Sequence, residues 1–315
     1  MLSPKVSIII LNWNGSKDTI DCLKSLENLN YPNFEIVLLD NGSTDNSIGI
    51  FRAQMPNFKN KITLIKNKEN LGFPAGNNVG IKYAIEHGTN YVLLLNNDTV
   101  VDKNFLKEMM TVGESGNKIG ILGPKIYFFA DPKRIWFGGG KFNWFSGSSH
   151  IDFGKQDFDA NGNPKETNFI TGCAMLIKKE VFKKIGFLDE RFFLYYEDTD
   201  FCLRAKKAGF QCFFVPKAKI WHKIPLESLK TKLSGAVDKI GAPSVLYYHH
   251  RNALLMIRNN APWLINILKH FWVAWKLLKQ WIKIIFFPKK KAASRAIIKG
   301  FYDYYRSRFG KMPPN

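Results

Sequence analysis

The amino-acid sequence predicts an α/β protein with a mostly parallel sheet flanked by helices and a C-terminal helical extension. Two alternations support this fold class: apolar runs alternate with amphipathic segments over the first hundred residues, and a strand followed by a helix recurs after Thr171. The pattern is helical from Pro243 onward. With 315 residues, 45% of them hydrophobic, the chain can form a substantial core and is too apolar for a disordered polycation.

The first hundred residues contain four predicted strands, each an apolar run of the kind buried on both faces of a parallel sheet. Helical spacing and turn residues separate them. The strands are expected at residues 6–11, 34–40, 61–66 and 91–95, and the helices at 18–29, from a cap near 43–45, and at 75–87.

The second half of the sheet region is less regular. Residues 113–168 are rich in Gly, Asn and aromatic residues, which indicates loops with short strands. Residues 171–186 indicate a strand entering a short helix, 198–208 a helix closed by Gly209, and 211–216 and 218–223 two further short strands.

Three polar clusters follow predicted strands, at residues 12–14, 40–43 and 96–98. Ligands of parallel sheets bind at the carboxyl ends of the strands, where these clusters are expected to meet. Asp40 fits either a turn cap or a ligand contact, and Asp98 with its amide neighbours offers hard oxygen ligands for a divalent cation.

Glu197, Asp198 and Asp200 open a predicted helix. Acidic side chains stabilise a helix N-terminus, and this effect alone can explain why three of them occur here. The aromatic residues around them would also desolvate a carboxylate, as a general base requires.

Six strings occur in order between residues 6 and 259: VSIIILNWNG, IVLLDNGSTD, NLGFPAGNN, LLLNNDT, the segment 171–210 and YYHHRN. Together they resemble glycosyltransferase family 2, in particular its bacterial rhamnosyltransferase-like branch. The resemblance implies a Rossmann-like GT-A fold, a nucleotide-diphosphate sugar donor, a divalent cation (Mg²⁺ or Mn²⁺) and inversion at the anomeric carbon.

The same resemblance implies a nucleotide site at the first two strand ends. Asn12 and Asn14 would line the nucleoside pocket, and Asp40 would hydrogen-bond the pyrimidine base. A loop over residues 72–77, with Asn78, would approach the ribose and phosphates, glycine allowing the close contact. The nucleotide-binding set is Asn12, Asn14, Asp40, Gly72, Gly76, Asn77 and Asn97.

Asp98 resembles the carboxylate of the family's metal-binding motif, and His222 its histidine near the metal or diphosphate. Asn96 stands where that motif has its first acid, so one carboxylate is missing. A nucleotide-sugar-binding homologue with weakened catalysis is therefore an alternative. For His222 the simpler alternative is a histidine at a surface strand end.

Asp198 resembles the family's catalytic base, with Glu197 and Asp200 as neighbours. His249, His250 and Arg251 would contact phosphates or an acceptor, although helix-surface charge accounts for each nearly as well. The expected donor is dTDP-rhamnose or a UDP-hexose, and the expected acceptor is a saccharide or a lipid-linked sugar of cell-surface polysaccharide synthesis.

We expect a GT-A catalytic domain over residues 1–242, with a nucleotide-sugar half to about 112 and an acceptor half over 113–242. A helical region would follow at 243–315. Residues 262–315 hold twelve basic residues and one acidic residue, so they carry +11 of the net +20.

Residues 262–287 form an apolar segment with lysines along one side. Lysine opposite Trp, Phe and Leu is typical of a helix lying in a membrane interface, and the membrane-associating segment is expected over 262–291. A helix packed on the domain, an oligomer contact and a transmembrane span are alternatives, the last disfavoured by its lysines.

Four dispersed cysteines and an apolar N-terminal run too short for a signal peptide favour a cytoplasmic protein at the inner face of the membrane. The charge also permits nucleic acid as partner, but the sequence has no recognised nucleic-acid-binding motif, and no nucleic acid is expected. Without GxGxxG or GxxxxGK[ST], a dinucleotide-dependent oxidoreductase and a P-loop triphosphatase are disfavoured.

Overall fold

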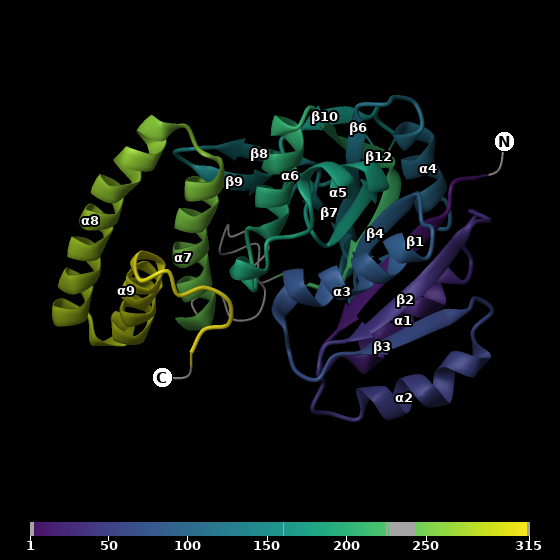
Figure 1. Ribbon diagram of the computed structural model, residues 1–315, viewed down its shortest axis with the longest axis horizontal. Coiled ribbons are helices and arrows are strands. Elements are labelled where there is room, and N and C mark those ends of the chain that lie inside the picture. The colour runs from purple at the N-terminus through teal and green to yellow at the C-terminus, as the bar shows by residue number, and fades with distance from the viewer. Residues whose placement is uncertain (1–2, 160, 225, 227–242, 314–315) are drawn as a thin grey trace.

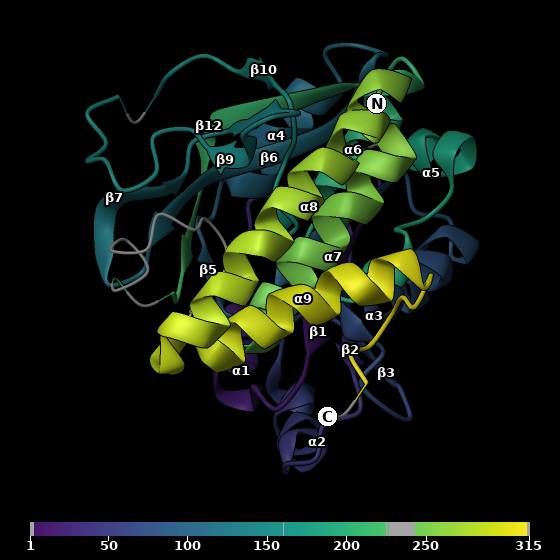
Figure 2. The same cartoon turned by 90° about the vertical axis from the view of Figure 1, so that its left-hand side faces the viewer.

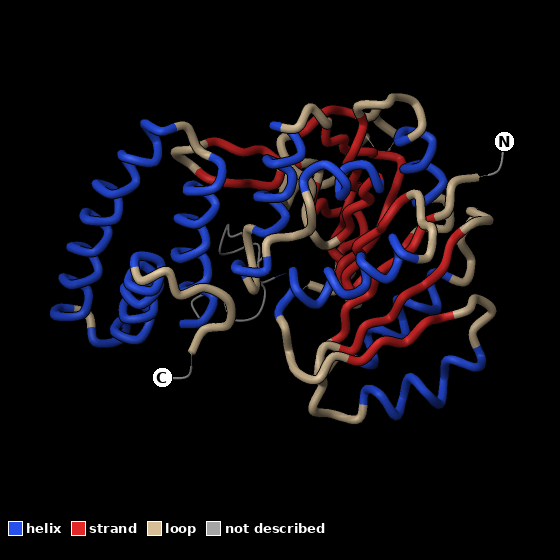
Figure 3. Tube along the Cα trace, in the orientation of Figure 1, coloured by secondary structure: helices blue, strands red, loops and turns tan. Residues whose placement is uncertain are grey.

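The computed structural model describes residues 3–313 except 160, 225 and 227–242. A ten-stranded sheet with helices around it forms one part of the described molecule, and a bundle of helices stands beside it (Figures 1 and 3). The strand order is β10-β12-β6-β11-β4-β1-β2-β3, with β5 beside β12 and β7 beside β6.

The predicted parallel strands are confirmed. Strands β3 (Ile62–Lys66), β2 (Phe34–Asp40), β1 (Val6–Asn12) and β4 (Tyr91–Asn96) are neighbours and all parallel. Most residues of β1 and β4 are buried, because layers cover both faces of the sheet there. The helices of this half are α1 (Ser16–Leu26), α2 (Ser47–Gln54) and α3 (Gly72–Glu86).

The second half makes the sheet mixed. Strand β11 (Ala174–Lys178) is antiparallel to both β4 and β6 (Ile119–Phe128), and β6 is buried along its whole length. The prediction of loops with only short strands over 113–168 is wrong at this strand. Gly120 and Gly123 interrupt its apolar pattern in the sequence, but the side chains of Phe210 and Ile170 pack where a Cβ would stand.

Residues 211–223 form one strand, β12 (Gln211–His222), in place of the two that the sequence predicts. Its pairing with β6 shifts between Val215 and Lys219, a bulge that accommodates Pro216. The remaining strands are β5 (Thr99–Val101), β7 (Asp131–Phe137), the hairpin of β8 (Gly140–Asn143) and β9 (Gly147–His150), and β10 (Lys165–Thr167).

Helix α6 (Glu197–Lys207) begins at the predicted acidic cluster, and Gly209, with a φ of +91°, follows its end. Helices α4 (Phe105–Gly113) and α5 (Lys179–Ile185) complete this part of the fold, with short 3-10 turns at Met55–Asn57 and Glu190–Phe192.

The predicted helical extension is confirmed through Tyr305. It consists of α7 (Pro243–Asn260), α8 (Trp263–Phe286), a 3-10 turn at Pro288–Lys290, and α9 (Lys291–Tyr305). Helices α8 and α9 cross in front of α7 when the molecule is turned (Figure 2). The expected boundary at residue 242 lies outside the described residues.

Helix α8 presents its apolar side to solvent. Lys269, Val273 and Gln280 are buried toward the rest of the bundle. The other side carries exposed apolar residues: Trp263, Leu264, Ile267, Leu268, Phe271, Trp275, Leu278, Trp281, Ile282 and Ile285. In the described part of the chain, no helix combines the length and apolarity needed to cross a bilayer.

Candidate active site

Polar side chains gather where β1 and β2 end, as the sequence predicts. Asn12 Nδ2 donates hydrogen bonds to Asp40 Oδ1 at 3.2 Å and to Ser43 Oγ at 3.1 Å. Asn14 Oδ1 accepts one from the backbone N–H of Thr44 at 2.8 Å. Asn12 and Asp40 are fully buried, and the bonds of Asn12 connect the loops that follow β1 and β2, whereas Asn14 is exposed. Nucleotide contact by these residues stays a prediction.

A pocket of about 560 Å³ opens beside these strand ends. Trp13 and Asn41 line it from the sheet, and Tyr248 and Lys311 line it from the C-terminal region. Trp13 and Asn41 fall within the polar clusters predicted at residues 12–14 and 40–43, but the sequence assigned no role to any of the four. Trp13, which is 55% exposed, could have been found as a large aromatic residue in a polar cluster directly after a buried strand.

The residues expected to form a glycine loop begin helix α3 instead. A Cβ at Gly72 would lie 2.5 Å from the carbonyl oxygen of Phe193, and one at Gly76 would lie 2.9 Å from Leu11. Both glycines therefore permit close packing within the protein. Asn77 Nδ2 donates to the carbonyl of Phe73 one turn earlier.

Two asparagines of the predicted nucleotide region connect parts of the fold. Asn78 is buried, and its side-chain amide bonds Leu188 and Glu190. The expectation that Asn78 approaches the nucleotide stays a prediction. Asn97 Nδ2 donates to Thr19 Oγ1 of α1 at 3.0 Å, and its predicted nucleotide contact remains untested.

Asp98 and His222, distant in sequence, come together. His222 Nε2 lies 3.0 Å from Asp98 Oδ1, because β5, directly after Asp98, pairs with the end of β12. Burial opposes charge on His222, but attraction to Asp98 and to Cys173 raises the pKa of His222 well above its usual value. Burial opposes charge on Asp98 too, yet His222 lowers the pKa of Asp98. The simpler reading of His222 as a surface strand-end residue is wrong, since it is 4% exposed.

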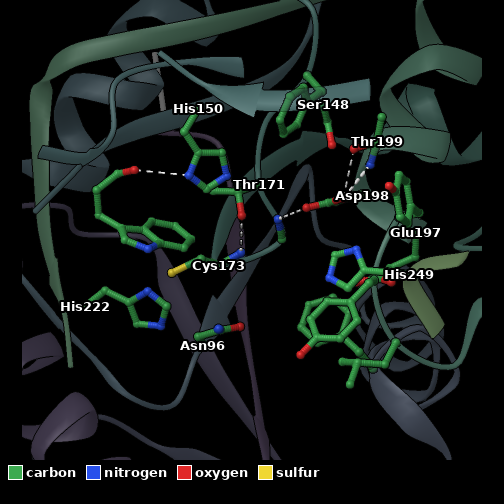
Figure 4. A pocket seen from close by; sticks show the side chains of 17 residues that line it. Asn96, Ser148, His150, Thr171, Cys173, Glu197, Asp198, Thr199, His222 and His249 are labelled. Carbon is green, nitrogen blue, oxygen red and sulfur yellow. Dashed lines mark hydrogen bonds between the residues drawn. The ribbon is translucent and has the colours of Figure 1, made fainter. Parts of the chain in front are cut away.

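A pocket of about 150 Å³ lies between His222 of this pair and the acidic start of α6. His222 and Asn96 line one side of it, and Asp198, Glu197 and His249 lie across from them (Figure 4). The structure thus places the predicted metal residue His222 and the predicted base Asp198 around one cavity.

Three hydrogen bonds orient the carboxylate of Asp198. Oδ2 accepts from the backbone N–H of Gly172 at 3.0 Å, and Oδ1 accepts from Thr199 N and Thr199 Oγ1 at 2.6 and 3.2 Å (Figure 4). These bonds favour the charged form. Burial outweighs them, so the pKa of Asp198 is raised above its usual value.

The two acidic neighbours of Asp198 differ in environment. Glu197 lines the same pocket, and no described group bonds its buried Oε2. Burial and then the charge of Asp198 raise the pKa of Glu197 well above its usual value. Asp200 is fully buried and accepts from Arg204 Nε at 2.8 Å and from Asn260 Nδ2 at 2.7 Å. It joins α6 to α7 and does not line the pocket.

The segment before α6 has an unusual backbone, with positive φ at Phe193, Tyr195 and Tyr196. Two residues of α7 hold it. Asn252 Nδ2 donates to the carbonyls of Phe192, Leu194 and Tyr195 at 2.7–3.0 Å, and Arg251 Nη2 donates to those of Arg191 and Phe192. Arg251 is fully buried, and its contact with phosphate or acceptor stays a prediction.

The two histidines of the same helix lie near the pocket. His249 lines it and stacks on Tyr195 at 4.7 Å between ring centroids. Burial lowers the pKa of His249 to about 4, so the ring is neutral near pH 7. His250 Nδ1 lies 2.8 Å from the carbonyl of Leu246, and His250 does not line this pocket.

Sequence reasoning also missed His150 and Trp136. Both line the pocket, and the Trp136 ring packs edge-on against His222 at 4.8 Å. His150 Nδ1 lies 3.1 Å from the carbonyl of Trp136, and burial lowers the pKa of His150 to about 4. Both residues lie in a region that reads as loops, so no strand pattern marked them.

The metal-binding side chains here fit a divalent cation that a bound diphosphate also helps to hold. Asp98 and His222 supply one carboxylate and one imidazole, which cations such as Mn²⁺ accept. Within the described residues, no group of three or more His, Cys, Asp or Glu side chains could hold a metal. A cation bound here would need further oxygen ligands, such as those of a diphosphate.

Comparisons with known proteins identify the family of the chain. Residues 7–186 match the family glycosyl transferase family 2. The chain is 25% identical over 268 residues to the dTDP-rhamnosyl transferase RfbF of Shigella flexneri, covering 84% of each chain. It is 24% identical over 210 residues to the N-acetylglucosaminyl-diphospho-decaprenol L-rhamnosyltransferase of Mycobacterium tuberculosis, covering 59% of this chain and 66% of that one.

The fold is also that of a solved GT-A enzyme. The mannosyltransferase PcManGT of Pyrobaculum calidifontis, in complex with GDP-Man and Mn²⁺, superposes with a TM-score of 0.57 at 12% identity, covering 98% of this chain and 89% of that one. At this identity the likeness shows the GT-A fold alone.

Proposed function

The chain belongs to glycosyltransferase family 2, and we propose that it is an inverting, metal-dependent enzyme that transfers a sugar from a nucleotide diphosphate to an acceptor hydroxyl. The observation that carries this proposal is the pocket between His222 and Asp198. A base and a site for diphosphate charge must face the same sugar carbon from opposite sides, and His222 and Asp198 line this cavity across from each other.

Asp198 would act as the general base. Its carboxylate would take the proton of the acceptor hydroxyl as that oxygen bonds to C1 of the sugar, while the bond from C1 to the diphosphate oxygen breaks and the electron pair leaves with the diphosphate. The bonds from Gly172 and Thr199 hold the carboxylate in one orientation, and its raised pKa strengthens it as a base. One displacement of this kind inverts C1.

Asp98 and His222 would hold the divalent cation, with the diphosphate completing its ligands. When bound, the cation neutralises the negative charge that develops on the departing diphosphate. Asn96 lines the cavity as a neutral side chain, so the site has one carboxylate fewer than the family motif. A nucleotide-sugar-binding homologue with weakened catalysis is the second candidate that this residue favours.

The donor would lie along the strand ends, with its base beside the exposed face of Trp13 and its sugar in the cavity. dTDP-rhamnose is our first choice, because RfbF is a dTDP-rhamnosyl transferase, and a UDP-hexose is the alternative. The acceptor would be a saccharide or a lipid-linked sugar of cell-surface polysaccharide synthesis. A lipid-diphosphate-linked sugar fits the M. tuberculosis relative, whose name describes one.

We also propose that the outer side of α8 lies on an anionic membrane surface at the inner face of the cell membrane. The polar side of α8 packs inward and the apolar side is exposed, the reverse of a helix in a water-soluble bundle. Lys279, Lys289 and Lys290 lie exposed beside this surface, and each such charge contributes about 1 kcal/mol of attraction to anionic lipid.

The donor and metal parts of the proposal are tested by binding. We expect dTDP-rhamnose or a UDP-hexose to bind more tightly with Mg²⁺ or Mn²⁺ than with a chelator, measured by calorimetry. Asp98→Asn should weaken metal-dependent donor binding about 10-fold or more, whereas Asp152→Asn, at an exposed residue with a φ of +56°, should not. Equal binding by Asp98→Asn and the wild type would contradict the metal site.

A further inference from the structure

A second cavity lies beside the reaction pocket. It is a groove of about 390 Å³ between the β8–β9 hairpin, α7 and α8, within the range of small-molecule sites. Its walls are mainly apolar and include Phe142 and Trp144 of the hairpin region, Ile257 of α7, and Leu268 and Trp272 of α8.

The groove and the reaction pocket share two lining residues, Tyr196 and His249. Tyr196 immediately precedes the acidic pair, so this end of the groove lies next to the proposed base. At the other end, Leu268 belongs both to the groove and to the exposed outer side of α8. The groove therefore lies between the proposed membrane surface and the reaction pocket.

The charge around the groove suits an anionic ligand. Lys269 is among its lining residues, and the described lining contains no Asp or Glu. Among the described groups, the Nζ of Lys269 bonds two neutral oxygens, those of Asn266 and Tyr304, both at 2.8 Å. His249 offers a buried Nε2 with no partner among the described groups.

We infer that this groove binds the hydrocarbon chain of a lipid-diphosphate-linked acceptor, whose sugar hydroxyl then reaches Asp198. The inference rests on the proposed transferase function and specifies its acceptor class. The chain would lie between the hairpin and α8, and the diphosphate near His249 and His250. The apolar chain accounts for the apolar walls, and the diphosphate would accept hydrogen bonds from the neutral imidazoles, with Lys269 as the cation of the described lining.

Farnesyl diphosphate is a suitable probe because it combines a prenyl chain with a diphosphate and dissolves in water without vesicles. We expect Ala253→Phe, which places a ring into the groove from α7, to weaken its binding at least 10-fold. Ala292→Phe adds the same ring at an exposed site on α9 and should leave binding within twofold. Inorganic diphosphate should bind wild-type protein at least 10-fold more weakly than farnesyl diphosphate.

Three results would overturn the inference: equal binding by Ala253→Phe and the wild type, equal binding of diphosphate with and without the prenyl chain, or a wild-type dimer that Ala253→Phe converts to a monomer. Nucleotide-sugar binding measured on the same samples separates the two claims. If it persists while farnesyl diphosphate fails to bind, the groove assignment alone is wrong. If the wild type binds no nucleotide sugar, the proposed function is wrong.

Discussion

Asp198 and Glu197 show how two adjacent carboxyl groups acquire different chemistry. Asp198 receives three hydrogen bonds that favour its charged form, whereas Glu197 has an unbonded buried oxygen beside that charge. The environment therefore keeps Glu197 protonated more readily than Asp198. This division suits a site that needs one base and no second negative charge near a diphosphate.

The raised pKa of Asp198 predicts the acid side of the pH profile. The base must be deprotonated, so kcat/KM should fall as the pH drops through that pKa, with a midpoint above the ordinary aspartate value of about 3.9. Initial rates across the acid range at subsaturating acceptor measure this limb. Glu197→Gln, which resembles the protonated acid, should leave the limb in place. If the Glu197→Gln variant lost this acid limb of the pH profile, the limb would report the titration of Glu197 and not that of Asp198.

For single residues, the sequence indicated which side chains gather near the strand ends better than it indicated the contacts that each one makes. Asp98, His222 and Asp198 were singled out because their motifs resemble those of the family, and their roles stay predictions. The structural contacts of Arg251 and Asn78 could not be predicted, because their partners are backbone carbonyls and side chains remote in sequence. The importance of Asn252 depends on three carbonyls in a segment with positive φ, which no local pattern indicates.

Among the elements, α8 carries the clearest functional signal. The sequence predicted its two sides, but three apolar residues, Ile265, Trp272 and Val273, fell on the polar side. The structure gives the reason: Val273 packs in the bundle core with Leu254 and Phe301, and the other two line the groove. Strands β6 and β12 were harder to predict, since Gly, Pro and a bulge interrupt their patterns.

Replacing apolar residues on the outer side of α8 should release the protein from membranes. Phe271→Glu and Leu278→Glu, at positions 71% and 61% exposed, should each reduce binding to vesicles of phosphatidylcholine with phosphatidylglycerol at least severalfold, measured by cosedimentation. The cause is lost apolar burial and repulsion from anionic lipid. Phe158→Glu is the matched control, because Phe158 is 96% exposed in a loop of the catalytic region.

Unchanged sedimentation of the two α8 variants would reject the membrane surface. A stable wild-type oligomer that Phe271→Glu dissociates would instead assign this side of α8 to contact between copies. Point variants are preferable to deleting residues 262–315, because α9 packs closely on α7 and Tyr247 donates to Asp303 at 2.8 Å. Such a deletion would expose the core of the bundle.

In the whole molecule, the proposed sites form a series. The series runs from the strand-end pocket beside Trp13 to the cavity between His222 and Asp198, then to the apolar groove and the outer side of α8. Phe73 and Leu194 line both the strand-end pocket and the cavity. The net charge of +20 accordingly has two expected partners, a diphosphate at the sheet and anionic lipid at the bundle. The sequence predicted the fold class and both ends of this series, but not the groove, which depends on tertiary packing.

The rate of sugar transfer by Asp198→Asn tests the central claim most directly. The amide keeps the shape of the side chain but cannot take a proton, so transfer should fall about 10²- to 10⁴-fold. Nucleotide affinity should stay close to that of the wild type and of Asp152→Asn. A variant that retains more than a few per cent of wild-type transfer would show that Asp198 is not the base.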